Sequence, residues 1–261
     1  MVKALPLCFL LMCMASLAQN NQPMTMYEKS WSEDRDESIP KARHYLQLTM
    51  GLALPGNTYS AGTPDQESGY ARTGFNGQMS GGYLLSKNVG WGATLGRYIS
   101  PISTDAYKQN ILFQLPAEDS HVNYIWTQNW QNTIFTTGPY ISLIQQRVLL
   151  DLYAQAGVLQ SRMPKIVVSG FDSENNFLHI RQSDSGLAFA FLTGASIGYL
   201  LPKFYRLRLM AKADLIGATP TFNRQTDIFT TNLHAQTKGH YRQSVGVFSL
   251  SVGLRYEFNA Y

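Results

Sequence analysis

The chain has 261 residues, of which 44% are apolar, 12% aromatic and 15% charged. The charged fraction lies well below the ~25% of an ordinary soluble domain, and the many aromatic residues exclude disorder for most of the chain. The formal net charge is only +4, and the sequence has no cluster of Lys and Arg that could neutralise successive phosphates. Nucleic acid is therefore excluded as a partner.

Residues 1–18 predict a cleaved signal peptide. Lys3 supplies a positive start, Leu5–Leu17 form a short apolar run, and Ser16-Leu17-Ala18 supplies the small residues read by a signal peptidase. The alternative of a membrane anchor needs about 20 apolar residues, and this run is too short. We therefore expect the mature chain to begin at Gln19.

Both cysteines, Cys8 and Cys13, lie within the predicted signal peptide. The mature chain would then contain no cysteine, which excludes disulfides and thiol catalysis. An alternative is a lipid anchor on Cys13, although Leu11-Met12 before it lacks the small residue that lipoprotein processing prefers.

Residues 19–43, with SWSEDRDES inside them, are polar and charge-dense. Beyond them, eight segments alternate between larger apolar residues and small or polar ones, with a period of two that predicts strands. In chain order they are approximately residues 45–54, 74–84, 89–98, 133–144, 150–158, 185–201, 205–215 and 244–258. Two features depart from this pattern: Pro139 removes one ladder donor, and Arg97 falls on the apolar face at a strand end, where its long side chain can reach the interface.

The last four segments have the clearest alternation, and all of their charges lie on one face. These charged residues are Asp151, Arg206, Arg208, Lys212, Asp214, Arg255 and Glu257. A one-residue slip would exchange the faces, so this distribution is not accidental. Segments of ten or more residues match the ~9–11 needed for a tilted transmembrane strand, whereas ordinary strands average ~5–6. The Gly, Ala and Ser beside the charges suit a narrow interior, which favours a membrane barrel over a soluble periplasmic ligand-binding barrel.

The connections alternate between short and long. Short turns are predicted at residues 86–88, 145–147 and 202–204, and long connections at 55–73, 100–132, 161–185 and 217–242. This alternation is typical of an eight-stranded antiparallel transmembrane β-barrel with short periplasmic turns and long extracellular loops. Residues 44–261 would form the barrel, and the polar residues 19–43 would be a periplasmic segment.

The signal peptide, the eight-strand pattern and the C-terminal SLSVGLRYEF resemble the small outer-membrane β-barrels of Gram-negative bacteria, the OmpA-type or porin-like class. The resemblance implies a C-terminal signal for the barrel-assembly machinery, here at Val252, Leu254, Tyr256 and Phe258. Asn259-Ala260-Tyr261 follow, so the final aromatic residue is out of phase with the strand. Outer-membrane lipids and lipopolysaccharide are the other implied partners. We expect no OmpA-like peptidoglycan-binding domain.

Eight strands leave an interior just wide enough for side chains. We therefore expect the seven charged residues to form a paired network there, since isolated charges in a dry interior are costly. A packed, closed core is the expected result, and a narrow ion path is the alternative. Rings near strand ends predict a membrane girdle; they are Trp91, Tyr98, Tyr199, Tyr205, Tyr256 and Phe258.

Long loops on a rigid scaffold often carry binding. The second long connection contains Tyr107, Trp126 and Trp130, together with Phe113 and Tyr124, which either stack on a ligand such as a sugar or pack within the loop. A strand extending above the membrane could also include residues 124–132. The expected function is thus a structural or surface-binding role, with another envelope or surface protein as a further partner and no cofactor or metal.

An enzyme that modifies lipid A, a hydrolase or acyltransferase, is the alternative. His121, His179, His234 and His240 lie in the predicted outer loops, with Glu118, Asp227 and several serines as further polar groups. Their spacing defines neither a catalytic geometry nor a metal site. The sequence therefore assigns no catalytic residue.

Overall fold

The computed structural model describes residues 44–62, 69–114, 121–172, 175–202, 204, 206–230 and 234–258. The predicted signal peptide and the polar segment of residues 19–43 lie outside the described residues. All of the described elements belong to one compact unit, Ala42–Tyr261.

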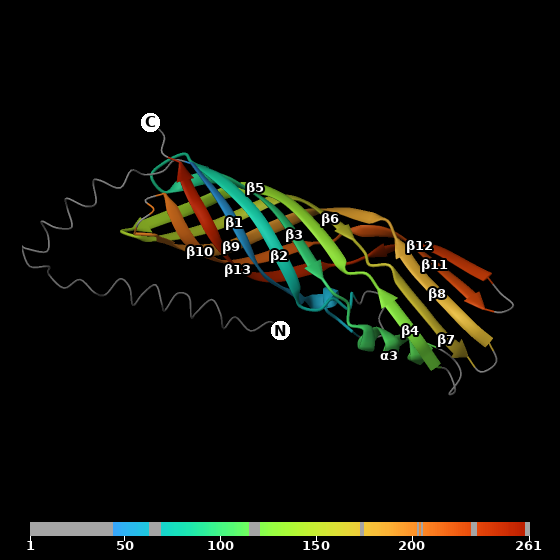
Figure 1. The fold of residues 1–261 in the computed structure, drawn as a ribbon. Coiled ribbons are helices and arrows are strands. Elements are labelled where there is room, and N and C mark those ends of the chain that lie inside the picture. Colours follow the sequence, from blue (N-terminus) through green and yellow to red (C-terminus); the bar gives the residue numbers. More distant parts are fainter. Residues whose placement is uncertain are drawn as a thin grey trace, which may run out of the picture. The chain divides into compact units, whose positions relative to one another are not determined.

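Eight antiparallel strands close into a barrel (Figure 1). They are β1 (His44–Gly56), β2 (Gly74–Leu84), β3 (Val89–Ser100), β5 (Trp130–Gln145), β6 (Val148–Arg162), β9 (Ser185–Leu200), β10 (Leu207–Ala218) and β13 (Val245–Phe258). Strands consecutive along the barrel wall pair with each other, and β13 closes the barrel on β1 from His44↔Phe258 to Gly56↔Gly246. The predicted eight-stranded fold is confirmed, and each predicted strand coincides with one of these eight.

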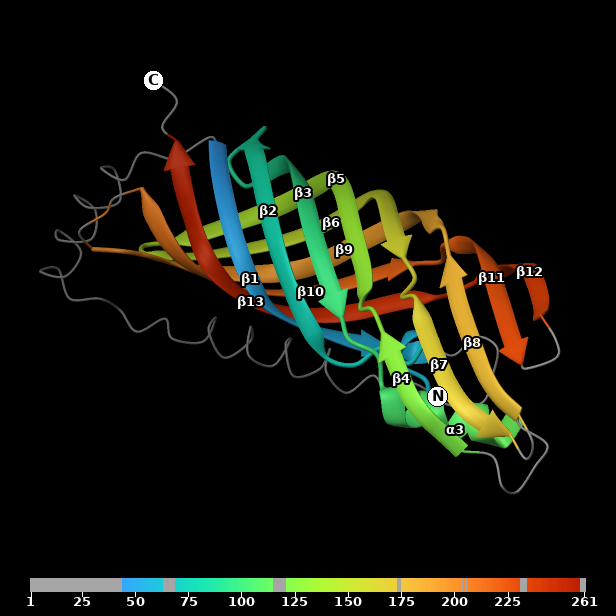
Figure 2. The ribbon, with the colours of Figure 1, turned by 45° about the vertical axis from the view of Figure 1, so that its right-hand side comes forward.

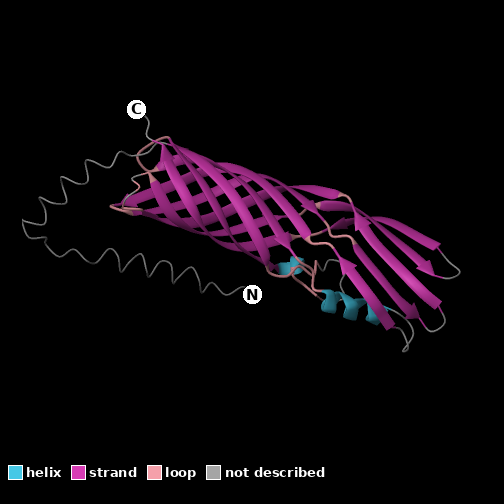
Figure 3. Cartoon of the chain, viewed as in Figure 1, coloured by secondary structure: helices cyan, strands magenta, loops and turns pink. Residues whose placement is uncertain are grey.

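Five further strands form a second antiparallel sheet in the order β12-β11-β8-β7-β4. They are β4 (His121–Thr127), β7 (Ile166–Asp172), β8 (Asn175–Ser183), β11 (Thr221–Thr230) and β12 (His234–Arg242). The sheet lies at the end of the barrel away from Phe258, with the helix α3 (Thr104–Gln114) near β4 (Figures 2 and 3). A short 3-10 helix, η1 (Asn57–Tyr59), follows β1.

The second sheet corrects the expectation of loops in three of the long connections. β4 lies between β3 and β5, the hairpin β7–β8 between β6 and β9, and the hairpin β11–β12 between β10 and β13. Backbone groups that project beyond a barrel need hydrogen-bond partners, and pairing with the neighbouring hairpin supplies them. A strand in this region was foreseen only for residues 124–132, and β4 covers part of that range.

The barrel wall separates apolar from polar side chains strand by strand. On β1, Leu48 and Met50 are 57% and 61% exposed, whereas Gln47 and Thr49, which alternate with them, are buried inside. On β9, β10 and β13 most of the large apolar side chains are likewise exposed on the outside, and the charged residues of β10 and β13 are buried inside. The inner face also holds a few large apolar residues, which are Leu192, Leu200, Met210, Ile216, Val245 and Val247. An apolar exterior around a polar interior is the arrangement that a lipid environment stabilises. No helix among the described residues is both long enough and apolar enough to cross a membrane.

Rings gather at the short-turn end of the barrel, as a membrane girdle requires. Trp91, Tyr199, Tyr256 and Phe258 are exposed there, and Tyr83 joins them. Tyr98 corrects the expectation, because it is buried on the inner face of β3 while its neighbour Arg97 points outward. The Arg97 guanidinium donates to the side-chain oxygen of Gln131 on the outer surface (2.9 Å). Tyr205 lies outside the described residues.

Candidate functional site

Ion pairs occupy the short-turn half of the barrel interior. Arg208 Nε lies 2.7 Å from Glu257 Oε1, and Arg255 Nε lies 3.6 Å from the same oxygen. Arg255 also pairs with Asp151 across the lumen and covers the ring of Tyr45, with 3.6 Å from its guanidinium carbon to the ring centroid. Each buried charge thus has a partner of opposite sign, which offsets the cost of removing it from water.

Asp214 is the centre of a second group nearer the middle of the barrel. Its carboxylate accepts from Tyr153 and from Gln78 (2.8 Å), and it pairs with Lys212 Nζ at 3.4 Å. Lys212 in turn donates to Gln78 Oε1 (2.5 Å). The barrel interior therefore contains Asp151, Asp214 and Glu257 opposite Arg208, Lys212 and Arg255, and their formal charges cancel. Sequence reasoning did not select Gln78 and Tyr153 as members of this network, although their places on the inward faces of their strands could have indicated them.

Arg206 is the residue of the predicted network that the structure places elsewhere. It is exposed and lies in the turn before β10, whose first residue is Leu207, so strand alternation does not fix its direction. Its carbonyl accepts from the backbone amide of Glu257 (2.8 Å).

Little space remains between these groups. A cavity lined by Tyr45, Asp151, Tyr153, Lys212 and their neighbours has a volume of about 10 Å³, which is about the space one water molecule requires. Glycines make room for the rings: a Cβ added to Gly82 would lie 2.6 Å from the Tyr45 ring and 2.9 Å from the Tyr140 ring.

An aromatic plug, defined here as Tyr59, Trp130, Phe222 and Tyr241, fills the other end of the barrel. Its members are all buried, and the ring of Trp130 packs edge-on against Tyr59 (5.3 Å between centroids) and Phe222 (6.0 Å). The indole of Trp130 donates to the Gly69 carbonyl (2.8 Å) and the hydroxyl of Tyr59 accepts from Asn132 (2.8 Å), so their buried polar atoms are satisfied.

The rings selected from the sequence as possible ligand contacts have separate positions. Trp130 belongs to the plug, and Tyr107 on α3 is buried against Tyr70, with 5.4 Å between the two ring centroids. Trp126 on β4 is 41% exposed, and Tyr124 is exposed beside it. Packing therefore accounts for Tyr107 and Trp130, whereas Trp126 and Tyr124 are accessible to a ligand.

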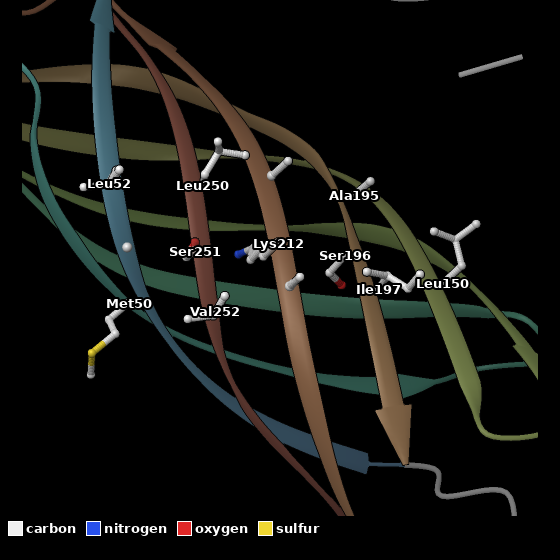
Figure 4. A pocket seen from close by; sticks show the side chains of 13 residues that line it. Met50, Leu52, Leu150, Ala195, Ser196, Ile197, Lys212, Leu250, Ser251 and Val252 are labelled. Carbon is white, nitrogen blue, oxygen red and sulfur yellow. The ribbon is translucent and has the colours of Figure 1, made fainter. Parts of the chain in front are cut away.

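A shallow depression of about 450 Å³ marks the lipid-facing wall over β1, β13, β10 and β9 (Figure 4). Small side chains at Ala195, Ala211 and Ala213 create it among larger neighbours such as Met50 and Leu250. Lys212 lies between Ala211 and Ala213 on β10, but its side chain is buried on the inner face of that strand. Because it is open and apolar, the depression has the chemistry of the surrounding wall and provides no polar group for catalysis.

The second sheet has two faces. The inner face continues the barrel interior, because buried residues alternate without interruption from Ile216 through Ala218 and Pro220 to Phe222. The outer face presents exposed rings, which are Tyr124, Trp126, Phe171 and Phe229.

The four histidines are on strands of the second sheet rather than in loops. His121 is at the start of β4, His179 on β8, and His234 and His240 at opposite ends of β12. They are not brought together, and the described residues contain no group of three or more His, Cys, Asp or Glu arranged to hold a metal.

His234 is the histidine with a carboxylate nearby. Its Nε2 lies 4.0 Å from Asp227 Oδ1, and its ring stacks on Phe229 with 4.3 Å between centroids. Asp227 accepts from Gln236 (2.8 Å) and Gln225 (3.0 Å to Oδ2), and these hydrogen bonds lower the pKa of the Asp227 carboxyl below its usual range. Among the described residues, Asp227 is thus held by amides on a sheet surface. Glu118 lies outside the described residues.

The residues of the predicted assembly signal, Val252, Leu254, Tyr256 and Phe258, are exposed on the outer face of β13, and the rings of Tyr256 and Phe258 pack edge-on (4.9 Å). They are accessible from the lipid side next to β1, where the barrel closes.

These features define a small β-barrel protein of the outer-membrane class. Among solved structures, Neisserial surface protein A (NspA) is similar, with 14% identity, a TM-score of 0.39, and an alignment covering 82% of this chain and 97% of that chain. A major outer membrane protein from Thermus thermophilus has 12% identity and a TM-score of 0.45, covering 84% and 100%. Ail, the attachment invasion locus protein of Yersinia pestis, has 15% identity and a TM-score of 0.36, covering 82% and 99%.

No protein-family model matches the chain, and no curated protein does. At such identities and TM-scores, these likenesses carry no conclusion about a ligand or an activity. The function is therefore argued from the residues of the barrel and the second sheet.

Proposed function

We propose that this chain is an outer-membrane β-barrel that binds a partner at the cell surface through its second sheet, and that it is neither a pore for large solutes nor an enzyme. In this proposal the short turns face the periplasm and the second sheet is extracellular. The observation that carries it is the contrast between a barrel interior filled by paired charges and an outer sheet face with exposed rings.

The filled interior supports the absence of a large pore. One ion-pair group fills the short-turn half of the barrel and the second fills its middle, while Trp130 with its aromatic neighbours fills the other end. In planar bilayers we expect at most small, irregular conductance. Large, stable conductance steps would contradict this part of the proposal.

The outer face of the second sheet supports surface binding. Exposed aromatic rings are enriched at protein interfaces, where they bury large areas with few rotatable bonds. Tyr124 and Trp126 lie on the edge strand β4. Phe171 lies on the neighbouring strand β7, where it is paired with His121 of β4. A partner could therefore contact these rings without entering the barrel.

The experiment is site-specific photocrosslinking on intact cells. A photoreactive phenylalanine derivative placed at Trp126 or Tyr124 should give one discrete adduct with a surface molecule. The matched control places the same group at Leu48, which is exposed on the barrel wall and should give only lipid adducts. A scan of the exposed positions of the sheet without a discrete adduct would overturn the surface-binding role.

The contact between His234 and Asp227 favours lipid A modification as the second candidate, since such a pair can move a proton. Deleting the gene would then change the lipid A mass spectrum, and wild type would restore it while His234→Ala or His240→Ala would not. Our proposal expects an unchanged spectrum in all of these strains.

A further inference from the structure

A basic cluster lies on the inner face of the second sheet, where β8 and β11 pair. His179, Arg181 and Ser183 alternate along β8, and their cross-strand partners on β11 are Ile228, Thr226 and Arg224. Because directly paired residues point to the same face, Arg181, Ser183 and Arg224 project from one side of the sheet. This is the side that continues the barrel interior.

The two guanidiniums lie over one aromatic ring. The guanidinium carbon of Arg181 is 5.4 Å from the centroid of the Tyr241 ring, and that of Arg224 is 5.1 Å from it. Neither arginine has an ion-pair partner among the described residues. Burial, followed by the neighbouring charge of Arg181, lowers the pKa of Arg224.

Three polar atoms of β8 are buried here without a hydrogen-bond partner among the described residues: His179 Nε2, Arg181 Nε and Ser183 Oγ. A buried polar atom without a partner costs ~1–3 kcal/mol, and these three lie on successive inward positions of one strand, beside two arginines that have no ion-pair partner among the described residues. By contrast, the carboxylate of Asp227 on the outer face accepts hydrogen bonds from Gln225 and Gln236.

We propose that this cluster binds a phosphate group. The planar fork of an arginine matches the oxygens of phosphate in a bidentate arrangement, and two forks together neutralise a dianion. The Ser183 hydroxyl and the Nε2–H tautomer of a neutral His179 supply further donors, and the ring of Tyr241 packs against both guanidiniums. The phosphate can belong to a soluble sugar phosphate or to the headgroup of lipopolysaccharide, and both present the same dianion to these donors.

The cluster is tested by titrating the folded full chain, in neutral detergent micelles at low salt, with inorganic phosphate. Isothermal calorimetry measures the binding. Arg181→Gln and Arg224→Gln should each weaken phosphate binding by roughly 10-fold or more, because each removes a charge-assisted pair of hydrogen bonds. Arg224→Lys keeps the charge without the fork and should give a smaller loss. The shift in gel mobility on boiling shows whether each variant is folded.

The matched control is Lys238→Gln. Lys238 is exposed on β12 and is paired with Gln225, which lies on the outer face of the sheet. The substitution therefore removes one positive charge from the face opposite the cluster. Phosphate binding should stay within about 2-fold of wild type, because a surface charge in water interacts weakly with a distant site. An equal loss in Lys238→Gln and Arg224→Gln would mean diffuse attraction and would overturn the site, as would a wild-type chain that does not bind phosphate.

Two further titrations distinguish the sources. Glucose 1-phosphate represents a soluble ligand, and lipopolysaccharide before and after phosphatase treatment represents the envelope. Binding of either phosphorylated probe that is lost in Arg224→Gln supports the site and identifies its source, whereas equal binding of phosphatase-treated lipopolysaccharide overturns it. Because these measurements use the inner face and the photocrosslinks use the outer face, failure of one proposal is distinguishable from failure of the other.

Discussion

The barrel and the second sheet use the same antiparallel pairing but distribute their polar side chains differently. In the barrel, every buried charge has an opposite charge within reach, and the apolar residues face outward. In the second sheet, the two half-buried arginines of the inner face have each other as charged neighbours, and rings are exposed on the outer face. The barrel interior thus pairs its buried charges, whereas the second sheet has two positive charges without an ion-pair partner among the described residues on one face and exposed rings on the other. Both features of the sheet suit a binding region.

The largest expected effect is in the lumen. Arg255→Ala should lower the free energy of unfolding by about 3–5 kcal/mol, because it leaves the buried Asp151 without a partner. Urea titration in detergent measures this loss. Adding Asp151→Asn to the same chain should recover part of it, and no recovery would show that the pair does not account for the loss.

A comparison of two tryptophans separates the plug from the outer face. Trp130→Ala should cost about 3–5 kcal/mol through the cavity it leaves among buried rings, seen as a lower temperature for the gel-mobility shift. Trp126→Ala removes an exposed ring and should stay within about 0.5 kcal/mol. Similar losses in the two variants would mean that the outer face is part of the packed core.

Two glycines of β2 test how tightly the lumen is filled. A Cβ at Gly82 would lie 2.6 Å from the Tyr45 ring, whereas a Cβ at Gly77 would have nothing within 4 Å. Gly82→Ala should therefore destabilise the barrel by about 1–3 kcal/mol through overpacking. Gly77→Ala should have little effect by the same urea titration, and equal behaviour would contradict a filled interior.

The smallest effect is a pH dependence of the pairing between β11 and β12. Because hydrogen bonds from Gln236 and Gln225 lower the pKa of Asp227 in the folded chain, its stabilising contribution is complete above the unfolded pKa of ~3.9. This contribution is lost as the pH falls through the lower folded value. Hydrogen exchange of the β11 and β12 amides should report increased opening below about pH 4, and Asp227→Asn should abolish this change.

The barrel could be predicted from the sequence because each of its strands has one face toward the lipid and one toward the lumen. Apolar and polar or small residues therefore alternate along the strand. On β13, for example, Phe248, Leu250 and Val252 face outward over the whole thickness of the wall while Ser249 and Ser251 are buried. The same alternation places Tyr98 inside once Arg97 is outside, so its assignment to the girdle was an avoidable error. The wrong assignment of Arg206 to the lumen network could not be avoided in this way, because Arg206 precedes the first residue of β10.

The second sheet could not be predicted because several of its strands lack a regular alternation of apolar and polar residues. On β4, a register shift between Val122 and Tyr124 interrupts the period of two, and on β11 Arg224 and Gln225 on opposite faces are equally half-buried. The basic cluster depends on pairing between two hairpins, so Arg181 and Arg224 become neighbours only in three dimensions. Spacing along the chain gives no signal for such a site.

The division of the second sheet among three connections has a consequence for how the chain folds. β4 pairs with β7, and β8 with β11, so strands from separate connections must meet. Contacts between distant parts of a chain form slowly because loop-closure entropy opposes them. The barrel strands at the base of each hairpin remove most of this entropy once they are aligned. Pairing of β6 with β9 and of β9 with β10 therefore brings β8 beside β11, so we expect the two arginines of the proposed phosphate site to meet only after these barrel strands have aligned.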